Sequence, residues 1–284
     1  MGQGLGSDEK DPRLLRQLDL ERPELRALLA RVPPQKTPQL SPEWLRCEML
    51  ERVQILRGAH VRPGARVLEV GAGPQAIGTV PLAHFVGGRG AVVAAERERW
   101  SRLCEIVDLA GVAGVVRPIA CDARWLPLSS DSLDAAYVLH AIRSLGSEEE
   151  IGAVFREMLR VAPSIWVAES LPEGRTEAQR AHLAMYRVRS RFFAAADGRP
   201  DDRPYLPLEG LVALVEASGG RVLEASTVEI DLPHALAYFP RENLLRVRDP
   251  GLRADLERQW DDACRLIAAH CADHPPVGVV SATR

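Results

Sequence analysis

The chain has 284 residues, 46% of them hydrophobic, so it is long enough to bury a large core. Its net charge of −3 argues against nucleic acid as a partner and against general attraction to an anionic membrane surface. No apolar run approaches the roughly 20 residues that a membrane-spanning helix needs. The five cysteines lack a Cys-x-x-Cys pattern, which indicates reduced thiols and a cytoplasmic protein.

The two helices predicted before the first strand cover 14–32, which ends at Pro33 and Pro34, and 42–58. Ser41 supplies an N-cap for the second helix, and a proline follows at its first position. We expect residues 1–60 to form an N-terminal helical extension and residues 61–284 to form the main domain.

From residue 66 onward, apolar strand-like runs alternate with amphipathic helical patterns. Strands are predicted at 66–70, 91–95, 115–120, 133–139 and 165–168, and helices at 76–86, 99–110 and 148–161. This alternation predicts an α/β fold with a Rossmann-like, doubly wound and mostly parallel sheet. Ligands of such sheets bind beyond the carboxyl ends of the strands.

The last part of the chain departs from this regular alternation of strands and helices. Helices are predicted at 174–196, 208–218 and 251–271, an exposed or edge strand at 221–230, and a last strand at 277–281. We expect a helical insertion at about 171–220 that forms a lid, and an antiparallel C-terminal strand.

A possible metal site near the C-terminus is weak. Cys264 and Cys271 lie near His270 and His274, but the seven-residue spacing of the cysteines places them on one helix face, as in a core. A structural zinc site needs four closely spaced ligands. No metal is therefore expected.

The stretch from Arg66 to Pro74 contains the strongest motif. A buried strand breaks into Gly71 and Gly73, which allow a sharp turn and a close approach of a ligand to the main chain. Glu69 lies one residue before the end of that strand, where a buried carboxylate needs a partner. The simplest partner is a cation on a bound ligand.

Carboxylates occur at the ends of the first three predicted strands, at Glu69, Glu96 and Asp122. A carboxylate after the second strand is suited to accepting hydrogen bonds from a ribose diol. A carboxylate after the third suits an exocyclic amine, because an ionised carboxylate only accepts hydrogen bonds. Together they describe a site for a nucleoside with a cationic tail.

A nicotinamide dinucleotide is the first alternative, because Gly71 to Ala76 matches the loose G-x-G-x-x-G/A pattern. Pro74, however, has no N–H to donate to a pyrophosphate, and Glu69 adds negative charge beside it. S-adenosylmethionine has no phosphate and carries an ammonium and a sulfonium, so neither objection applies to it.

The run VLEVGAG at 67–73 resembles the first motif of class I S-adenosylmethionine-dependent methyltransferases. The run CDARWLPL at 121–128, followed by SLD at 132–134, is similar to a signature of the ubiquinone/menaquinone-methyltransferase-like group. The resemblance covers residues 60–170 and implies S-adenosyl-L-methionine as cofactor. The implied cofactor-binding residues are Glu69, Gly71, Ala72, Gly73, Glu96, Arg97, Asp122, Ala123 and Leu139. Arg97 departs from the family, which places an apolar residue against the adenine there, and Trp125 is an alternative contact.

The reaction that the resemblance implies is methyl transfer to a small organic acceptor, by in-line displacement at the sulfonium methyl. His140, just after the fourth strand, is a candidate base or a packing histidine, and Arg143 is a candidate for orienting an anionic acceptor. His182, Tyr186 and Arg189 share one helix face, which either lines a lid or is a solvated or packed surface.

Two other functions remain open from the sequence. One is a protein that binds S-adenosylmethionine or S-adenosylhomocysteine without transferring the methyl group, since Arg97 is unusual and no base is evident. The other is methylation of RNA or protein, which a basic stripe from Arg175 to Arg191 keeps open. Neither the acceptor nor the oligomeric state follows from the sequence.

Overall fold

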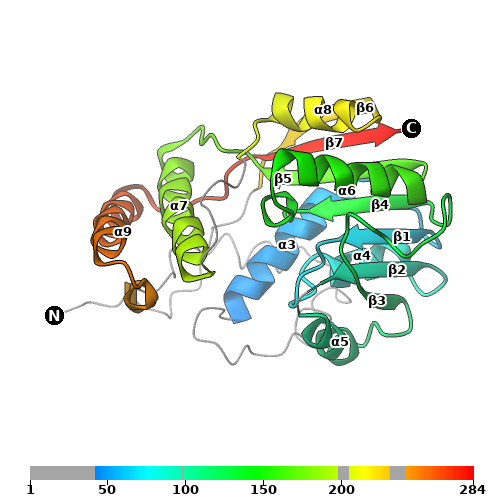
Figure 1. Cartoon of the computed structure of the whole chain (residues 1–284), viewed down its shortest axis with the longest axis horizontal. Coiled ribbons are helices and arrows are strands. Elements are labelled where there is room, and N and C mark those ends of the chain that lie inside the picture. The colour runs from blue at the N-terminus through cyan, green and yellow to red at the C-terminus, as the bar shows by residue number, and fades with distance from the viewer. Residues whose placement is uncertain (1–41, 98, 198–204, 231–240) are drawn as a thin grey trace.

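The apolar runs of the chain form a seven-stranded sheet (Figure 1). The computed structural model describes residues 42–97, 99–197, 205–230 and 241–284. The strands are β1 (Arg66–Val70), β2 (Ala91–Glu96), β3 (Val116–Ala120), β4 (Ala135–Leu139), β5 (Ser164–Ser170), β6 (Arg221–Val228) and β7 (Val277–Thr283). Their order across the sheet is β3-β2-β1-β4-β5-β7-β6. The predicted helix at 14–32 and the Ser41 N-cap lie outside the described residues.

The first five strands are parallel, as predicted. β1 pairs with β2 on one side and with β4 on the other, so that Val70 lies opposite both Ala95 and Val138. The carboxyl ends of these strands consequently meet at one edge of the sheet. That edge brings the residues that follow β1, β2, β3 and β4 together.

The C-terminal strand β7 is antiparallel to both of its neighbours, β5 and β6. It inserts between them, and β6 forms the edge of the sheet. Residues of β7 are buried almost throughout, whereas every residue of β6 is partly or fully exposed. Both expectations, an antiparallel last strand and an edge strand over 221–230, are confirmed.

Helices cover both faces of the sheet. They are α3 (Pro42–Gly58), α4 (Thr79–Val86), α5 (Trp100–Leu109), α6 (Glu148–Val161), α7 (Glu177–Asp197), α8 (Leu208–Ala217) and α9 (Pro250–His270), with short 3-10 helices η1 (Ile142–Ser144) and η3 (Arg241–Arg246). One apolar cluster joins α3, α4 and α5 to the sheet, and a second joins α6 and α8 to its other face. This is the doubly wound arrangement that the alternation predicts.

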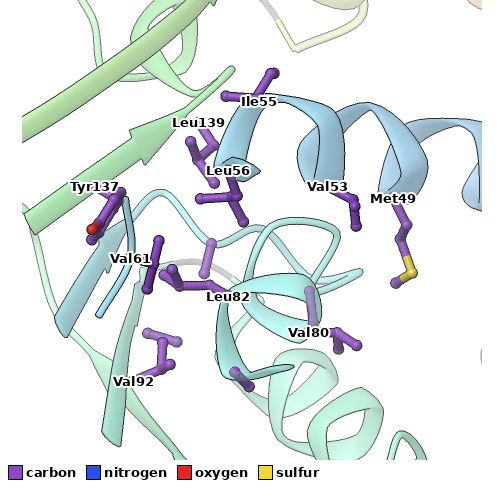
Figure 2. Close-up of a cluster of buried hydrophobic side chains, with 14 of the residues drawn as sticks. Met49, Val53, Ile55, Leu56, Val61, Val80, Leu82, Val92, Tyr137 and Leu139 are labelled. Carbon is purple, nitrogen blue, oxygen red and sulfur yellow. The ribbon is translucent and has the colours of Figure 1, made fainter. Parts of the chain in front are cut away.

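Helix α3 packs directly on the sheet (Figure 2). Met49, Val53 and Leu56 point toward the side chains of α4 and of β4, where Tyr137 and Leu139 are part of the same cluster. All five side chains are buried. The helix predicted as part of an N-terminal extension therefore shares its core with the sheet.

Helices α7 and α9 pack against each other beside the sheet (Figure 1). Their contact contains a third apolar cluster, in which Met185, Phe192 and Leu256 are fully buried. Helix α8, in contrast, contacts β6 and β7 and so belongs to a layer over the sheet. Within the described ranges, no helix is long and apolar enough to cross a membrane.

Candidate functional site

The turn after β1 has the conformation that its glycines predict. Gly71 and Gly73 both have a φ of 69°, the left-handed region that favours glycine. A Cβ on Gly71 would lie 2.5 Å from the Cβ of Ala141, closer than two non-bonded carbon atoms approach. Ala72 donates its backbone N–H to the carbonyl of Ala95 over 3.2 Å, which ties the turn to the end of β2.

Glu69 of β1 is buried and faces the start of α4. The Thr79 hydroxyl donates a hydrogen bond to Glu69 Oε2. A Cβ on Gly78 would lie 2.1 Å from Glu69 Oε1, so a larger residue there would displace this carboxylate. Burial raises the pKa of Glu69 to about 7, although the Thr79 hydroxyl and the charge of Arg52 act to lower it. The pKa of the Glu69 carboxyl is therefore close to neutral pH.

Glu96, at the end of β2, supports the glycine turn. Its Oε2 accepts the backbone N–H of Gly73 over 3.1 Å, and its Oε1 accepts the N–H of Arg99 over 3.3 Å. The carboxylate predicted to bind a ribose diol therefore also braces the glycine turn.

Asp122, which follows β3, is surrounded by two arginines. Arg124 donates to it through its backbone N–H over 2.9 Å, and through Nε over 3.0 Å and Nη2 over 2.6 Å, while Arg97 Nη1 donates over 3.1 Å. The hydrogen bonds from Arg124 hold the pKa of Asp122 at about 2. Ala123 packs on the second apolar cluster, whereas the Trp125 side chain is 79% exposed.

His140 lies directly after β4 and is buried. Its backbone is left-handed, with a φ of 53°, and its N–H bonds the carbonyl of Ala168 over 2.8 Å. The ring places Nε2 2.6 Å from Glu51 Oε1 and Nδ1 3.1 Å from the Ser170 hydroxyl. Burial and Arg52 act to lower the pKa of His140, but the carboxylates of Glu51 and Glu169 outweigh them and raise it.

Glu51 of α3 and His274, which precedes β7, complete this buried cluster. The Nε2 atom of His274 lies 2.8 Å from Glu51 Oε1, and its Nδ1 lies 2.6 Å from the carbonyl oxygen of Pro275. The other oxygen of Glu51, Oε2, is paired with Arg52. Burial acts to raise the pKa of Glu51, but Arg52 and the two histidines lower it well below its ordinary range.

Arg143, in η1, is buried beside this cluster. It pairs with Glu169 of β5 over 3.0 Å, and its guanidinium lies over the ring of Tyr186 at 4.2 Å and near that of Tyr205 at 5.0 Å. Glu169 also accepts the backbone N–H of Ile142 over 3.1 Å. Although burial opposes it, Arg143 lowers the pKa of Glu169 to about 2.

Helix α7 closes the cluster on another side. The ring of His182 lies 6.1 Å from that of Tyr186, stacked on it, and 5.8 Å from that of His274. His182 is buried, so this helix face is packed against the site and is not a solvated surface.

The sequence predictions missed Glu51, Glu169 and His274. Glu169 follows the same rule as Glu69, a carboxylate near the end of a buried strand, and that signal was available. His274 was considered only together with the nearby cysteines, whereas it lies against α3. Glu51 has no local signal, because its neighbours come from β4 and from the segment before β7.

The residues at this edge fit S-adenosylmethionine at two points. Gly71 and Gly73 hold the turn in a left-handed conformation, and Glu69 is a buried carboxylate with no cationic side chain hydrogen-bonded to it in the described residues. Asp122, predicted to accept hydrogen bonds from an exocyclic amine, differs from expectation. Arg97 and Arg124 already donate hydrogen bonds to it. The roles of these residues in cofactor binding stay predictions, and the structure defines the contacts of each.

No protein-family model and no curated protein matches the sequence. Solved structures, however, match nearly the whole chain. A cyclopropane-fatty-acyl-phospholipid synthase-like protein from Lactobacillus casei is 17% identical, with 92% of this chain and 99% of that chain covered and a TM-score of 0.68. A putative sarcosine dimethylglycine methyltransferase from Galdieria sulphuraria is 14% identical, with 89% and 92% covered and a TM-score of 0.52. The [4+2]-cyclase SpnF is 16% identical, with 96% and 93% covered and a TM-score of 0.53.

The chain has the Rossmann-like methyltransferase fold. The predicted fold class is therefore confirmed, from the parallel strands to the antiparallel C-terminus. Identities below 20% extend no further than the fold, so the more specific likeness to the ubiquinone/menaquinone-methyltransferase-like group stays a prediction.

Proposed function

We propose that this protein transfers a methyl group from S-adenosyl-L-methionine to a small organic acceptor. The observation that carries the proposal is the meeting of a glycine turn with three carboxylates, Glu69, Glu96 and Asp122, at the carboxyl ends of the first three strands of this fold. The solved neighbours whose names describe methyltransferases support methyl transfer as the reaction. The free thiols of the described cysteines support a cytoplasmic location.

Each end of the cofactor has its own group of residues in this proposal. Glu69 and the turn Gly71–Gly73 hold the methionine part, with the Leu139 side chain beside Gly78 and Glu69. Glu96 accepts from the ribose hydroxyls. Asp122, Ala123 and Arg97 lie on the adenine side, where the hydrogen bonds from Arg124, together with the charge of Arg97, keep the pKa of Asp122 low.

The cofactor supplies an electrophilic methyl group, so the chain must orient the acceptor in line with the sulfur and exclude water. His140 and Arg143 lie on the acceptor side, beyond the ends of β4 and β5. Both side chains are buried and favour the cationic form, so they suit an acceptor that carries or develops negative charge. His140 contacts polar groups through both ring nitrogens, and it acts as a base only after one of these contacts opens.

A second candidate function is cofactor binding without methyl transfer. The contacts at both ring nitrogens of His140 support it, because they leave no nitrogen free to act as a base. The fold also supports chemistry other than methyl transfer, since one solved neighbour is a [4+2]-cyclase by name. Turnover separates the two candidates, because only the first forms S-adenosylhomocysteine.

Titration calorimetry with S-adenosylmethionine and S-adenosylhomocysteine tests the cofactor. We expect micromolar binding by the wild-type chain and a loss of at least 100-fold in Gly71→Val, because a side chain at this φ is strained and meets Ala141. Gly88→Ala is the matched control, since nothing lies within 4 Å of its Cβ position. Circular dichroism checks that both variants are folded.

Absence of binding by the wild-type chain would overturn the proposed function. Equal binding by Gly71→Val would move the cofactor away from the glycine turn. Where binding is confirmed, incubation with a library of small acceptors and measurement of S-adenosylhomocysteine decides between transfer and simple binding.

A further inference from the structure

A cavity of about 110 Å³ lies at the opposite edge of the sheet from the glycine turn. It is bounded by the amino ends of β1, β4 and β5 and by the segment 59–65, which joins α3 to β1. The chain turns at His60, whose φ of 48° is left-handed, and this turn forms one wall. None of the residues assigned above to the cofactor or to the acceptor lines this cavity.

Two aromatic side chains form a large part of the cavity wall. Tyr137 of β4 and Trp166 of β5 are register partners, with ring centres 6.5 Å apart and ring planes at 48°. Both lie on the sheet face that α3 covers, where Tyr137 is at the border of the apolar cluster (Figure 2). Val67 and Ala135 add apolar surface beside them. This wall suits a planar ring, which can pack against the two aromatic side chains.

Two hydrogen-bond donors of the cavity have no partner within the described residues. Tyr137 is only 4% exposed, and its hydroxyl makes no hydrogen bond there. Burial raises the pKa of Tyr137 to about 12, although the charge of Arg62 acts to lower it, so the hydroxyl stays protonated. Arg62 is exposed at the mouth of the cavity, and its guanidinium makes neither an ion pair nor a hydrogen bond with a described residue.

The acidic residue of the lining, Asp134, is already in use. Its Oδ2 accepts the backbone N–H of Arg66 over 2.7 Å, and its backbone oxygen accepts the Ser164 hydroxyl over 3.3 Å. The groups that remain to meet a ligand are thus a cation and a neutral hydroxyl. Both donate hydrogen bonds to an anion, and the fork of an arginine binds a carboxylate at two points.

We propose that this cavity binds a small aromatic carboxylate, with its ring against Tyr137 and Trp166 and its carboxylate at Arg62 and the Tyr137 hydroxyl. An apolar cavity of about 150 Å³ takes up benzene, so a volume of about 110 Å³ with an open mouth holds one ring and excludes a fused pair of rings. The carboxylate then lies toward the mouth, where Arg62 is exposed. This is a second small-molecule site, separate from that of the proposed methyl transfer.

Titration calorimetry of the full-length chain with benzoate tests the site without S-adenosylmethionine. We expect one benzoate per chain with a Kd on the order of 0.1–1 mM, as for a ligand of so few atoms. Benzyl alcohol keeps the ring but carries no charge, and should bind at least about 10-fold more weakly. Acetate keeps the carboxylate but lacks the ring, and should show no measurable binding.

Variants locate the bound benzoate. Arg62→Gln should weaken binding by about 10-fold and Tyr137→Phe by about 5-fold, because each removes one donor to the carboxylate. Asp134→Asn should strengthen binding by a few-fold, because it removes a negative charge from the lining. Arg89→Gln is the matched control, since Arg89 is an exposed arginine before β2 at the same edge of the sheet but outside the cavity. Circular dichroism confirms that each variant is folded.

The wild-type titrations keep the proposal falsifiable even where a variant does not fold. Absence of saturable binding up to about 10 mM benzoate, or equal affinities for benzoate and benzyl alcohol, would overturn it. Benzoate binding that Arg62→Gln leaves unchanged would do the same, because the anion would then lie elsewhere, for example on the acceptor side beside Arg143. None of these results depends on S-adenosylmethionine, so the proposed function stands or fails separately.

Discussion

Glu69 and Glu169 are equally buried carboxylates with opposite acid–base behaviour. Each is 2% exposed and lies near the carboxyl end of a central strand. The pKa of Glu69 is about 7, because burial dominates and its hydrogen-bond partner is a neutral hydroxyl. The pKa of Glu169 is about 2, because Arg143 and His140 outweigh burial. The nearest cation, and not the depth of burial, decides which carboxylate is charged.

Glu69 should make the free protein less stable as the pH rises. Its folded pKa of about 7 exceeds the unfolded value, so the folded state binds a proton more tightly. That stabilisation is complete below about pH 4.5 and is lost as the pH rises through 7, by on the order of 2–3 kcal/mol. Urea unfolding of the wild-type chain and of Glu69→Gln at pH 5 and pH 8 measures it.

The comparison uses the difference between the two proteins at each pH, because other groups contribute equally to both. We expect the free energy of unfolding of Glu69→Gln to increase relative to that of the wild type as the pH increases. A constant difference between pH 5 and pH 8 would show that Glu69 titrates normally. Added S-adenosylmethionine should reduce the pH dependence, because an ammonium beside Glu69 favours the charged form.

Glu169 has the opposite role, as the counter-ion of a buried arginine. Glu169→Gln leaves Arg143 buried without its carboxylate partner, which costs about 3–5 kcal/mol. Thermal and urea unfolding at pH 7 measure the loss. Glu149→Gln, at an exposed position on α6, is the control and should change the free energy of unfolding by less than about 0.5 kcal/mol. An equal effect of the two variants would contradict the ion pair.

At the level of single elements, local signals set where helices begin. Helix α6 starts at a capping box, in which Ser147 accepts the N–H of Glu150 and Glu150 accepts the N–H of Ser147. Helix α9 starts with Asp249 as N-cap and a proline at the next position. Helix α4 was predicted from Ala76 but begins at Thr79, because Ala76 has a left-handed φ of 54° and is still part of the turn.

The capping box of α6 gives a prediction at this scale. Ser147→Ala removes the side-chain acceptor of an otherwise unpaired helix N–H, and should lower the free energy of unfolding by about 1 kcal/mol. Ser147→Asp is the matched variant, since aspartate also caps helices and should retain most of the stability. Chemical denaturation of the three proteins tests it, and equal losses in both variants would rule out the cap.

At the level of the whole molecule, the last strand, β7, occupies an internal position in the sheet. The strand comes from the C-terminus of the chain, yet it lies inside the sheet and pairs along its length with both β5 and β6. Val277 and Val280 are fully buried. Helix α9 and the segment containing His274 lead into it, so β7 also determines where that part of the site lies.

Removal of residues 277–284 should therefore prevent cooperative folding, although only a short terminal segment is lost. The deletion unpairs β6 from the sheet and exposes the edge of β5. The control is deletion of Arg284 alone, which removes an exposed ion pair with Asp131 and should change stability by less than about 1 kcal/mol. A sharp thermal transition in the long deletion would contradict a central role for β7.

The sequence by itself determined the parts of this protein whose signals are local. Apolar runs predicted the strands, glycines predicted the left-handed turn after β1, and the pattern placed carboxylates at the ends of the first three strands. The buried polar cluster beyond the ends of β4 and β5 was decided only in the tertiary structure. Glu51, His140 and His274 are separated by more than 80 residues at each step of the chain, and their pattern exists only where α3, β4 and β7 meet. Periodicity and short motifs report on neighbours along the chain, whereas burial and charge pairing depend on neighbours in space.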